Sequence, residues 1–299
     1  MNELLFDRKL LRLNRARMFT HFDQHNFLHH EVAKRIAENA ESLNLATNHL
    51  LEIGALDGYL SSLIASKKKT RIDLDLRTCS KSRCGEASSA VLSSTEAERT
   101  SSYMSIGTQK NSARSPSAVR DFEQVLIADD EFLPFKPQTF DLVVSNLNMH
   151  FVNEIPQFLL QVKNILKPGG VFIASFFGEE NLRELAHVLH KSEVEIYDGI
   201  SPRMPPTIDV KTAAMLLQKA GFAEAISDFE KIEVSYSDPK NLLRDLKMMG
   251  QGNILTKRSR KFFTKKFLQK ILQNYRELYG AADDTVQATF EIITATGRR

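Results

Sequence analysis

The residues with the clearest chemical potential lie between Asn48 and Tyr59, in the sequence NHLLEIGALDGY. A short apolar run ends there in an acid and two glycines, with Glu52, Gly54 and Gly58 spaced as acid-x-Gly-x-x-x-Gly. A strand, a glycine turn and a helix in this order cradle a nucleotide-like ligand at the carboxyl end of the first strand of an α/β sheet. Glycine permits this contact because the backbone turns tightly and approaches the ligand without an intervening Cβ. The turn alone is a weak indication, since glycine turns also follow strands in proteins that bind nothing.

Polar side chains that could bind a ligand also stand at the ends of the later predicted strands. They are Asp75, Asp129, Asp130, Ser145, Asn146 and His150. Each has an ordinary explanation as well, because aspartates form turns and a buried histidine is often only hydrogen-bonded. Glu52 could likewise cap or pair at a strand end. Their position at the ends of successive strands favours one binding site at the ligand-binding edge of a sheet.

The elements that must position these residues alternate between helices and strands. Apolar residues recur at helical spacing from Phe27 to Ser42, and a helical pattern runs from Leu60 to Ala65 after the glycine turn. Later strands are predicted at 71–76, from 122 to between 128 and 131, and at 171–177, 229–236 and 288–297, and the segment 140–152 is predicted to be a strand that runs into a turn. Pro168-Gly169-Gly170 is predicted to stop a helix before the fifth strand. This alternation predicts a mostly parallel sheet that is covered on both faces.

The predicted organisation is an N-terminal helical segment at 1–47 and one domain at 48–299. Residues 77–119 are rich in Ser, Thr and charged side chains, with few aliphatic ones. Such a stretch buries too little apolar area to offset its ordering entropy, so we predict a disordered surface insertion. A short solvent-facing helix near 87–98 and a phosphorylated loop remain alternatives. Residues 178–210 are predicted to form a helical elaboration.

Composition excludes several classes of protein. The chain of 299 residues has 40 Lys and Arg against 37 Asp and Glu, and this small net charge of +3 implies no nucleic-acid partner. Its two cysteines, Cys79 and Cys84, argue against a disulfide framework and lack the nearby histidine pair of a zinc site. We therefore predict no metal and a cytoplasmic location. No apolar segment approaches the roughly 20 residues of a transmembrane helix.

Two basic segments need a separate interpretation. The Arg-rich N-terminus carries Glu3 and Asp7, so we expect it to belong to the mature protein rather than to a presequence. The run at 257–270, KRSRKFFTKKFLQK, is predicted to be an amphipathic helix with a solvated cationic face. Contact with an acidic partner, or peripheral contact with the inner face of the membrane, is the alternative.

Six motifs in this order resemble a known family. They are LEIGALDGY, IDLDL, ADDEFLPF, FDLVVSNLNMHFV, LKPGGVFIASFF and LLQKAGF. Together they resemble the class I S-adenosylmethionine-dependent methyltransferases. The resemblance implies an α/β fold with a Rossmann-like, seven-stranded, mostly parallel sheet, helices on both faces and helical elaborations. It covers nearly the whole chain except the Ser-rich insertion.

One subfamily is more closely similar. FDRKLLRLNRAR, ADDEFLPF, DLVVSNLNMHFVNEIP and YRELYG resemble the mitochondrial complex I assembly factor described as an arginine hydroxylase, with its bacterial counterparts. The malonyl-carrier-protein methyltransferases of biotin synthesis are a more distant match.

The resemblance implies S-adenosylmethionine as the cofactor and a place for each part of it. The turn from Glu52 to Gly58 would hold the amino-acid end. Asp75 would accept hydrogen bonds from the ribose hydroxyls, and its charge would favour the sulfonium. Asp129 would accept from the adenine amino group, with the backbone of Asp130 near the ring. Leu133 to Phe135 would form an apolar wall.

The same resemblance places the methyl acceptor. Ser145 and Asn146 would close the site where the methyl group faces its acceptor, beneath the region 182–206. His150, which precedes an aromatic residue as in the family, is the candidate for a base or a substrate-orienting group. Leu56 departs from the family, whose loop usually has one more glycine there. A branched side chain at this position would crowd the methionine moiety and restrict φ and ψ.

Three functions follow. The first is an S-adenosylmethionine-dependent methyltransferase with a small-molecule or protein acceptor, in which catalysis is chiefly proximity and orientation. The second is an arginine hydroxylase-like assembly factor that acts on a subunit of respiratory complex I. The third is a non-catalytic binding or scaffold protein that has lost its cofactor, which Leu56 and the long insertion suggest.

Overall fold

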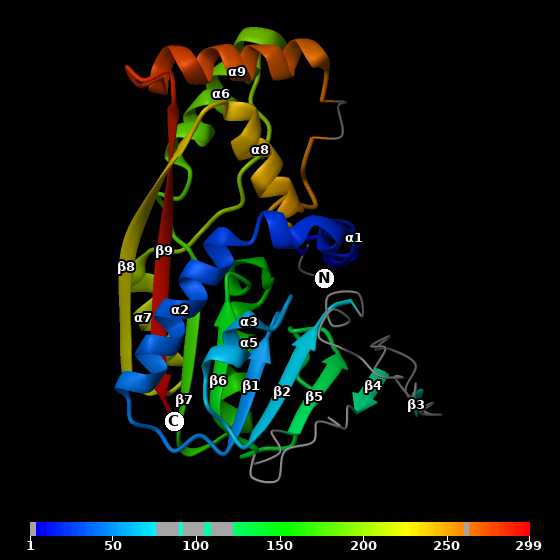
Figure 1. Cartoon of the computed structure of the whole chain (residues 1–299), viewed down its shortest axis with the longest axis vertical. Coiled ribbons are helices and arrows are strands. Elements are labelled where there is room, and N and C mark those ends of the chain that lie inside the picture. Colours follow the sequence, from blue (N-terminus) through cyan, green and yellow to red (C-terminus); the bar gives the residue numbers. More distant parts are fainter. Residues whose placement is uncertain (1–3, 76–89, 92–104, 109–121, 260–262) are drawn as a thin grey trace. The chain divides into compact units, whose positions relative to one another are not determined.

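A nine-stranded sheet with the strand order β3-β4-β5-β2-β1-β6-β7-β9-β8 forms the framework of the computed structural model (Figure 1). The structure describes residues 4–75, 90–91, 105–108, 122–259 and 263–299. Its strands are β1 (His49–Ile53), β2 (Lys68–Asp73), β3 (Ala90–Val91), β4 (Ser105–Thr108), β5 (Phe122–Ile127), β6 (Phe140–Asn146), β7 (Leu166–Phe177), β8 (Ala223–Tyr236) and β9 (Val286–Arg298). Seven of these, in the order β5-β2-β1-β6-β7-β9-β8, form the predicted Rossmann-like sheet, and β3 and β4 extend it.

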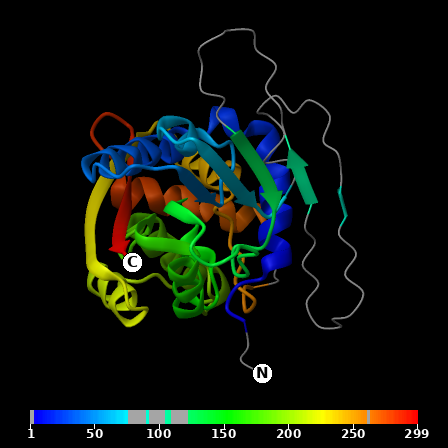
Figure 2. The same cartoon turned by 90° about the horizontal axis from the view of Figure 1, so that it is seen from below.

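The helices of the described residues separate many of these strands, but no helix lies between β5 and β6. They are α1 (Arg8–Met18), η1 (Phe19–Gln24), α2 (Phe27–Ser42), α3 (Tyr59–Leu63), η2 (Met149–Phe151), α5 (Ile155–Ile165), α6 (Arg183–Tyr197), α7 (Val210–Lys219), α8 (Pro239–Met248) and α9 (Lys265–Tyr279). Helix α2 lies on one face of the sheet and α7 on the other (Figures 1 and 2). On the α5 side, Phe158 and Phe222 both pack against Phe172 of β7.

The chain order of the strands reverses beside β1. Strands β5, β2, β1, β6 and β7 are parallel neighbours. After β1 the chain continues to β2 and β5 on one side, and it then returns to β6 on the other side of β1. In open α/β sheets a ligand binds in the crevice at such a reversal, outside the carboxyl ends of the strands. The fold therefore directs attention to the residues that follow β1 and β6.

Strands β2 and β5 end earlier than predicted, and β5 ends at Ile127. Strand β2 ends at Asp73 rather than at Leu76, because the Asp73 side chain accepts a hydrogen bond from the Leu74 amide at 2.6 Å and the extended backbone stops there. Strand β6 ends at Asn146 because Leu147 adopts a left-handed backbone with φ of 46°. Asp75 consequently lies beyond its strand, and His150 lies in a turn after β6, as predicted.

The segment Pro168-Gly169-Gly170 does not form the predicted helix stop. Helix α5 ends at Ile165, and β7 begins at the next residue and includes the Pro-Gly-Gly sequence. The Gly169 amide donates to the Arg299 carbonyl at 3.1 Å, and the Arg299 amide donates to the Gly170 carbonyl at 2.9 Å. These hydrogen bonds with Arg299 hold the two glycines in the sheet. A local sequence pattern does not predict a hydrogen-bond partner so far away along the chain.

Most of the predicted insertion at 77–119, including Cys79 and Cys84, lies outside the described residues. Within it, β4 pairs antiparallel with β5, and β3 pairs antiparallel with β4. The described part of this segment is therefore extended backbone. The disorder expected elsewhere in the segment stays a prediction.

The chain divides into two compact units, each described separately. The first comprises Met1–His25, Phe177–Val210 and Phe229–Ile293, and the second comprises Asn26–Phe176, Lys211–Asp228 and Thr294–Arg299. All residues of the site described below belong to the second unit. The predicted boundary between residues 47 and 48 and the elaboration at 178–210 stay predictions.

In the first unit, a buried carboxylate anchors the Pro-rich segment that follows α6. Glu193 accepts hydrogen bonds from the Ser201 amide at 2.9 Å, from the Ser201 hydroxyl, and from Arg203 Nε at 2.7 Å. Burial opposes its charge, but these hydrogen bonds outweigh burial and hold the pKa of Glu193 below its usual value. The Arg203 guanidinium also lies 4.6 Å from the centre of the Phe267 ring.

Candidate functional site

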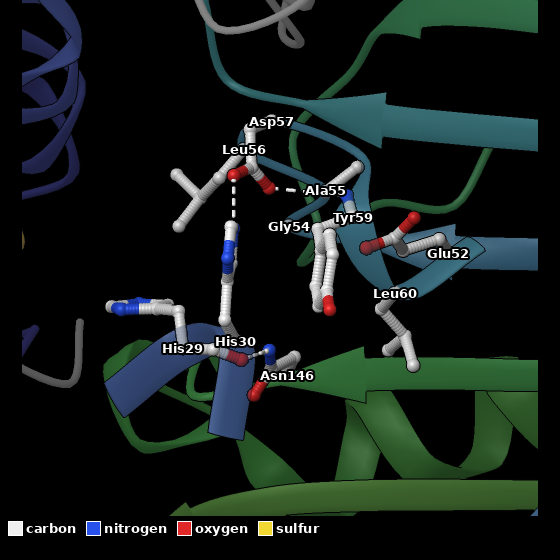
Figure 3. Close-up of a pocket in the computed structure, with 10 residues that line it drawn as sticks. All are labelled: His29, His30, Glu52, Gly54, Ala55, Leu56, Asp57, Tyr59, Leu60 and Asn146. Carbon is white, nitrogen blue, oxygen red and sulfur yellow. Dashed lines mark hydrogen bonds and ion pairs between the residues drawn. The ribbon is translucent and has the colours of Figure 1, made fainter. Parts of the chain in front are cut away.

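A small pocket lies at the carboxyl ends of β1 and β6, where the strand order reverses. Its lining residues come from the start of α2, from β1 and the glycine turn, and from the end of β6 (Figure 3). They are His29, His30, Glu52, Gly54, Ala55, Leu56, Asp57, Tyr59, Leu60 and Asn146. Its cavity has a volume of about 10 Å³, which is space for about one water molecule. The residues that line the pocket, rather than its volume, make it the candidate site.

The two glycines of the turn adopt left-handed backbones that glycine favours. Gly54 has φ of 71° and Gly58 has φ of 72°. A Cβ on Gly54 would lie 2.5 Å from the Asn148 side chain, and one on Gly58 would lie 1.5 Å from the Arg71 guanidinium. Both glycines therefore make room for neighbouring protein side chains. The sequence predicted only that they let a ligand approach the backbone.

Leu56 occupies the third left-handed position of this turn, with φ of 45°. Its amide donates to Asp73 Oδ2 at 2.9 Å, and its side chain extends from the turn away from Glu52 (Figure 3). Asp73 is buried, and its other carboxylate oxygen accepts from the Leu74 amide. Sequence analysis missed Asp73 and chose Asp75. The parallel pairing of Ile53 with Ile72, which brings Asp73 next to the turn, is the signal that finds it.

Glu52 places a carboxyl group inside the pocket wall. Its side chain is buried, and Oε2 accepts a hydrogen bond from the Ser61 amide at 3.1 Å. Burial raises the pKa of Glu52 to about 7, while hydrogen bonding from Ser61 and the charge of Arg71 act in the opposite direction. A buried carboxyl group that titrates near neutrality is typical of functional sites and gains stability from a cationic ligand.

The three predicted aspartates lie near this edge of the sheet but do not line the pocket. Asp75 is buried two residues beyond β2. Asp129 Oδ1 accepts from the Glu131 amide at 3.0 Å, the turn contact that its residue type favours. Asp130 is buried and accepts from Asn148 Nδ2 at 2.6 Å, so it supports the side chain that packs against Gly54.

Ser145 and Asn146 contribute buried oxygens at the end of β6. Asn146 Nδ2 donates to the His29 carbonyl at 2.8 Å, which fixes the orientation of the amide because a carbonyl accepts only from the nitrogen. Within the described residues, Asn146 Oδ1 and Ser145 Oγ are buried and have no hydrogen-bond partner. Buried oxygens that lack donors suit a ligand that carries N–H or O–H groups, such as a hydroxylated, ammonium-bearing cofactor.

The first turn of α2 contributes His29 and His30, which lack the spacing of metal ligands and were not predicted to belong to the site. His30 Nε2 lies 2.7 Å from Asp57 Oδ2, and the His30 ring stacks on Tyr59 with 3.8 Å between centroids (Figure 3). The His29 carbonyl holds Asn146 on the opposite side of the pocket. The signal for these residues was the His29-His30 pair at the start of a long amphipathic helix.

His150, the candidate base, is buried in the 3₁₀ turn η2. Its ring lies 4.2 Å from that of Phe151, centroid to centroid. It is not among the residues that line the pocket. Its predicted catalytic role stays a prediction.

The described residues contain neither a cluster of metal-binding side chains nor a membrane-spanning helix. No three or more His, Cys, Asp or Glu side chains in these ranges are grouped so that they could hold a metal ion. No helix in the described part of the chain has both the length and the apolar character needed to cross a membrane.

Comparison with known families gives one match along the central part of the chain. Residues 51–174 match the family described as "Methyltransferase domain". A protein of Rickettsia prowazekii named as a methyltransferase, RP459, is 33% identical over 159 residues, which cover 53% of this chain and 70% of that protein.

A second relative carries a different activity in its name. The human mitochondrial arginine-hydroxylase NDUFAF5 is 41% identical over 172 residues, which cover 58% of this chain and 50% of that protein. The chain thus spans about half the length of this curated relative. Among solved structures, the YcgJ protein of Bacillus subtilis superposes with a TM-score of 0.55 at 12% identity, over 90% of this chain and 98% of that one. This likeness concerns the fold alone.

Proposed function

Since this chain belongs to the class I S-adenosylmethionine-dependent methyltransferases, we propose that it transfers a methyl group from S-adenosylmethionine to a small-molecule or protein acceptor. The observation that carries the proposal is the pocket at the strand-order reversal, where buried Glu52 faces a space lined by the glycine turn. The orphaned Oδ1 of Asn146, which lines this pocket, supports a ligand that donates a hydrogen bond there.

Each residue has a proposed role. Glu52 pairs with the ammonium group at the amino-acid end of the cofactor, and the turn from Gly54 to Gly58 surrounds that end. Asp75 accepts from the ribose hydroxyls, and Asp129 accepts from the adenine amino group, with the backbone of Asp130 near the ring. When bound, the cofactor supplies a methyl group that is activated on a sulfonium. The protein supplies alignment, which accounts for most of the catalysis in such a transfer.

The acceptor side of the site is proposed to lie at the end of β6. Ser145 and Asn146 close the site there, and His150 is the proposed base or orienting group. The family resemblance, rather than a feature of the pocket, supports the role of His150.

Replacing Asp75 with alanine is expected to weaken binding of S-adenosylmethionine and S-adenosylhomocysteine by at least about tenfold, because hydrogen bonds to a charged acceptor contribute about 1.5–3 kcal/mol. Isothermal titration of the purified protein measures both affinities. Asp228→Ala is the matched control, since Asp228 is exposed on β8. No binding by a folded wild-type sample would contradict the proposal and favour a non-catalytic protein that has kept only the fold.

A second candidate function is hydroxylation of an arginine in a subunit of respiratory complex I. The supporting observation is that this chain is 41% identical to the human arginine-hydroxylase NDUFAF5, in an alignment that covers 50% of that protein. In a strain that lacks the gene, this arginine is then expected to carry one oxygen atom fewer than in the wild-type strain. Mass spectrometry of the peptide that contains the arginine detects the difference. Arginines with the same mass in both strains would exclude this candidate. A cytoplasmic location with peripheral membrane contact stays a prediction under either function.

A further inference from the structure

The glycine turn keeps a ligand-binding shape although one of its left-handed positions is a leucine. A non-glycine residue in the left-handed region is strained, since its Cβ crowds the backbone carbonyl. Leu56 has φ of 45° and lies between the two left-handed glycines of the turn, Gly54 and Gly58. Other contacts must therefore hold residue 56 in this conformation.

Three residues around the turn are linked in a closed triangle, two of its contacts between side chains and one between a side chain and a backbone amide. Asp57 Oδ2 lies 2.7 Å from His30 Nε2, and Asp57 Oδ1 accepts from the Tyr59 amide at 3.1 Å. The rings of Tyr59 and His30 complete the triangle, with an interplanar angle of 16° and centroids 3.8 Å apart. Asp57 and Tyr59 flank Gly58, and Asp57 follows Leu56 directly, so the triangle constrains the part of the turn that bears the strain.

The triangle is anchored to the rest of the unit through α2. His30 lies in the first turn of α2, and its amide donates to the Asn26 carbonyl at 2.9 Å. The neighbouring His29 carbonyl accepts from Asn146 at the end of β6. The start of α2 is thus attached to both sides of the pocket, and His30 and Tyr59 line it.

We propose that His30, Asp57 and Tyr59 form a clasp that keeps the turn from Gly54 to Gly58 in its ligand-binding conformation, so that leucine functions where glycine is expected. His30 and Tyr59 are positioning residues in this inference, because they act on the ligand through the turn. The inference rests on the proposed function, since it concerns the same cofactor site.

A double-mutant cycle between His30→Ala and Leu56→Gly tests the clasp. With Leu56 present, His30→Ala releases the turn and is expected to weaken S-adenosylhomocysteine binding by about tenfold or more. In the Leu56→Gly background the left-handed conformation carries no Cβ penalty, and His30→Ala is expected to weaken binding by less than about threefold. Isothermal titration of the four proteins measures the coupling.

Matched variants separate the clasp from a general loss of packing. Tyr59→Phe keeps the ring that stacks on His30 and is expected to bind like the wild type, whereas Tyr59→Ala is expected to behave like His30→Ala. His190→Ala removes an exposed histidine on α6 and is expected to leave the affinity unchanged. Thermal melting identifies any variant that fails to fold, and Asp57→Asn then provides a milder disruption of the same triangle.

Amide hydrogen exchange tests the clasp without any ligand. His30→Ala is expected to speed exchange of the amides from Gly54 to Gly58 by about tenfold with Leu56 present, and by much less in the Leu56→Gly background. An equal effect of His30→Ala in both backgrounds would overturn the clasp. If the wild-type protein binds neither cofactor form, the proposed function fails while the exchange experiment still decides whether the clasp holds the turn.

Discussion

Replacing Glu52 with glutamine is expected to stabilise the protein above neutral pH and to leave its stability nearly unchanged in mild acid. Burial raises the pKa of this carboxyl group from 4.5 to about 7. Between these values the folded protein holds a proton that the unfolded chain has released. The free energy of unfolding therefore falls as pH rises through this window, by about 3 kcal/mol in total, and stays lower above it.

Glutamine removes this loss because it stays neutral at every pH and keeps an oxygen that accepts from the Ser61 amide. Urea denaturation of both proteins from about pH 4 to about pH 8 measures the effect. The difference in unfolding free energy is expected to grow with pH in favour of Glu52→Gln. Glu38→Gln, at an exposed position on α2, is the control and should show no such trend. If the unfolding free energies of wild type and Glu52→Gln changed in the same way with pH, the burial of Glu52 would carry no pH-dependent cost in stability.

The same substitution is expected to weaken binding of S-adenosylmethionine under the proposed function. An ammonium group beside Glu52 favours the carboxylate, so wild-type affinity should rise with pH through neutrality and binding should release a proton. Titration in two buffers of different ionisation enthalpy measures that proton. Greater stability together with weaker binding would show that the protein keeps a destabilising buried acid for its ligand.

Replacing Asp73 with alanine is expected to destabilise the protein by about 3 kcal/mol or more, because two buried amides lose their acceptor. The Asp73 carboxylate accepts from the Leu56 amide at 2.9 Å and from the Leu74 amide at 2.6 Å, and the side chain is buried. The loss of the first of these hydrogen bonds also releases the strained residue of the glycine turn. Cofactor affinity is therefore expected to fall together with stability.

Urea denaturation near neutral pH measures the change in the free energy of unfolding. Asp73→Asn is expected to lose less stability than Asp73→Ala, since its single side-chain oxygen can replace one of the two acceptors. Asp228→Ala, at an exposed position, should change the unfolding free energy by no more than about 0.5 kcal/mol. If Asp73→Ala fell within the range of this control, the turn would not depend on Asp73.

The sequence by itself determined the fold and the location of the site. Alternating apolar runs and helical patterns depend on local spacing, and spacing predicted the strands, the helices and the mostly parallel sheet. The glycine turn after the first strand predicted a site at the edge of the sheet where a pocket lies, and Glu52, Gly54 and Asn146 line that pocket. The family resemblance rested on the same motifs, because short segments at strand ends form the binding edge of this fold.

Only the tertiary structure decided which side chains meet at that edge. Asp73 rather than Asp75 supports the turn, because the parallel register between β1 and β2 brings Asp73 beside residue 54. His30 reaches Asp57 across 27 positions of sequence, and the two glycines make room for Asn148 and Arg71. Such contacts depend on the register of strands and on the packing of a helix over a turn, and neither is encoded in the spacing of residues along the chain.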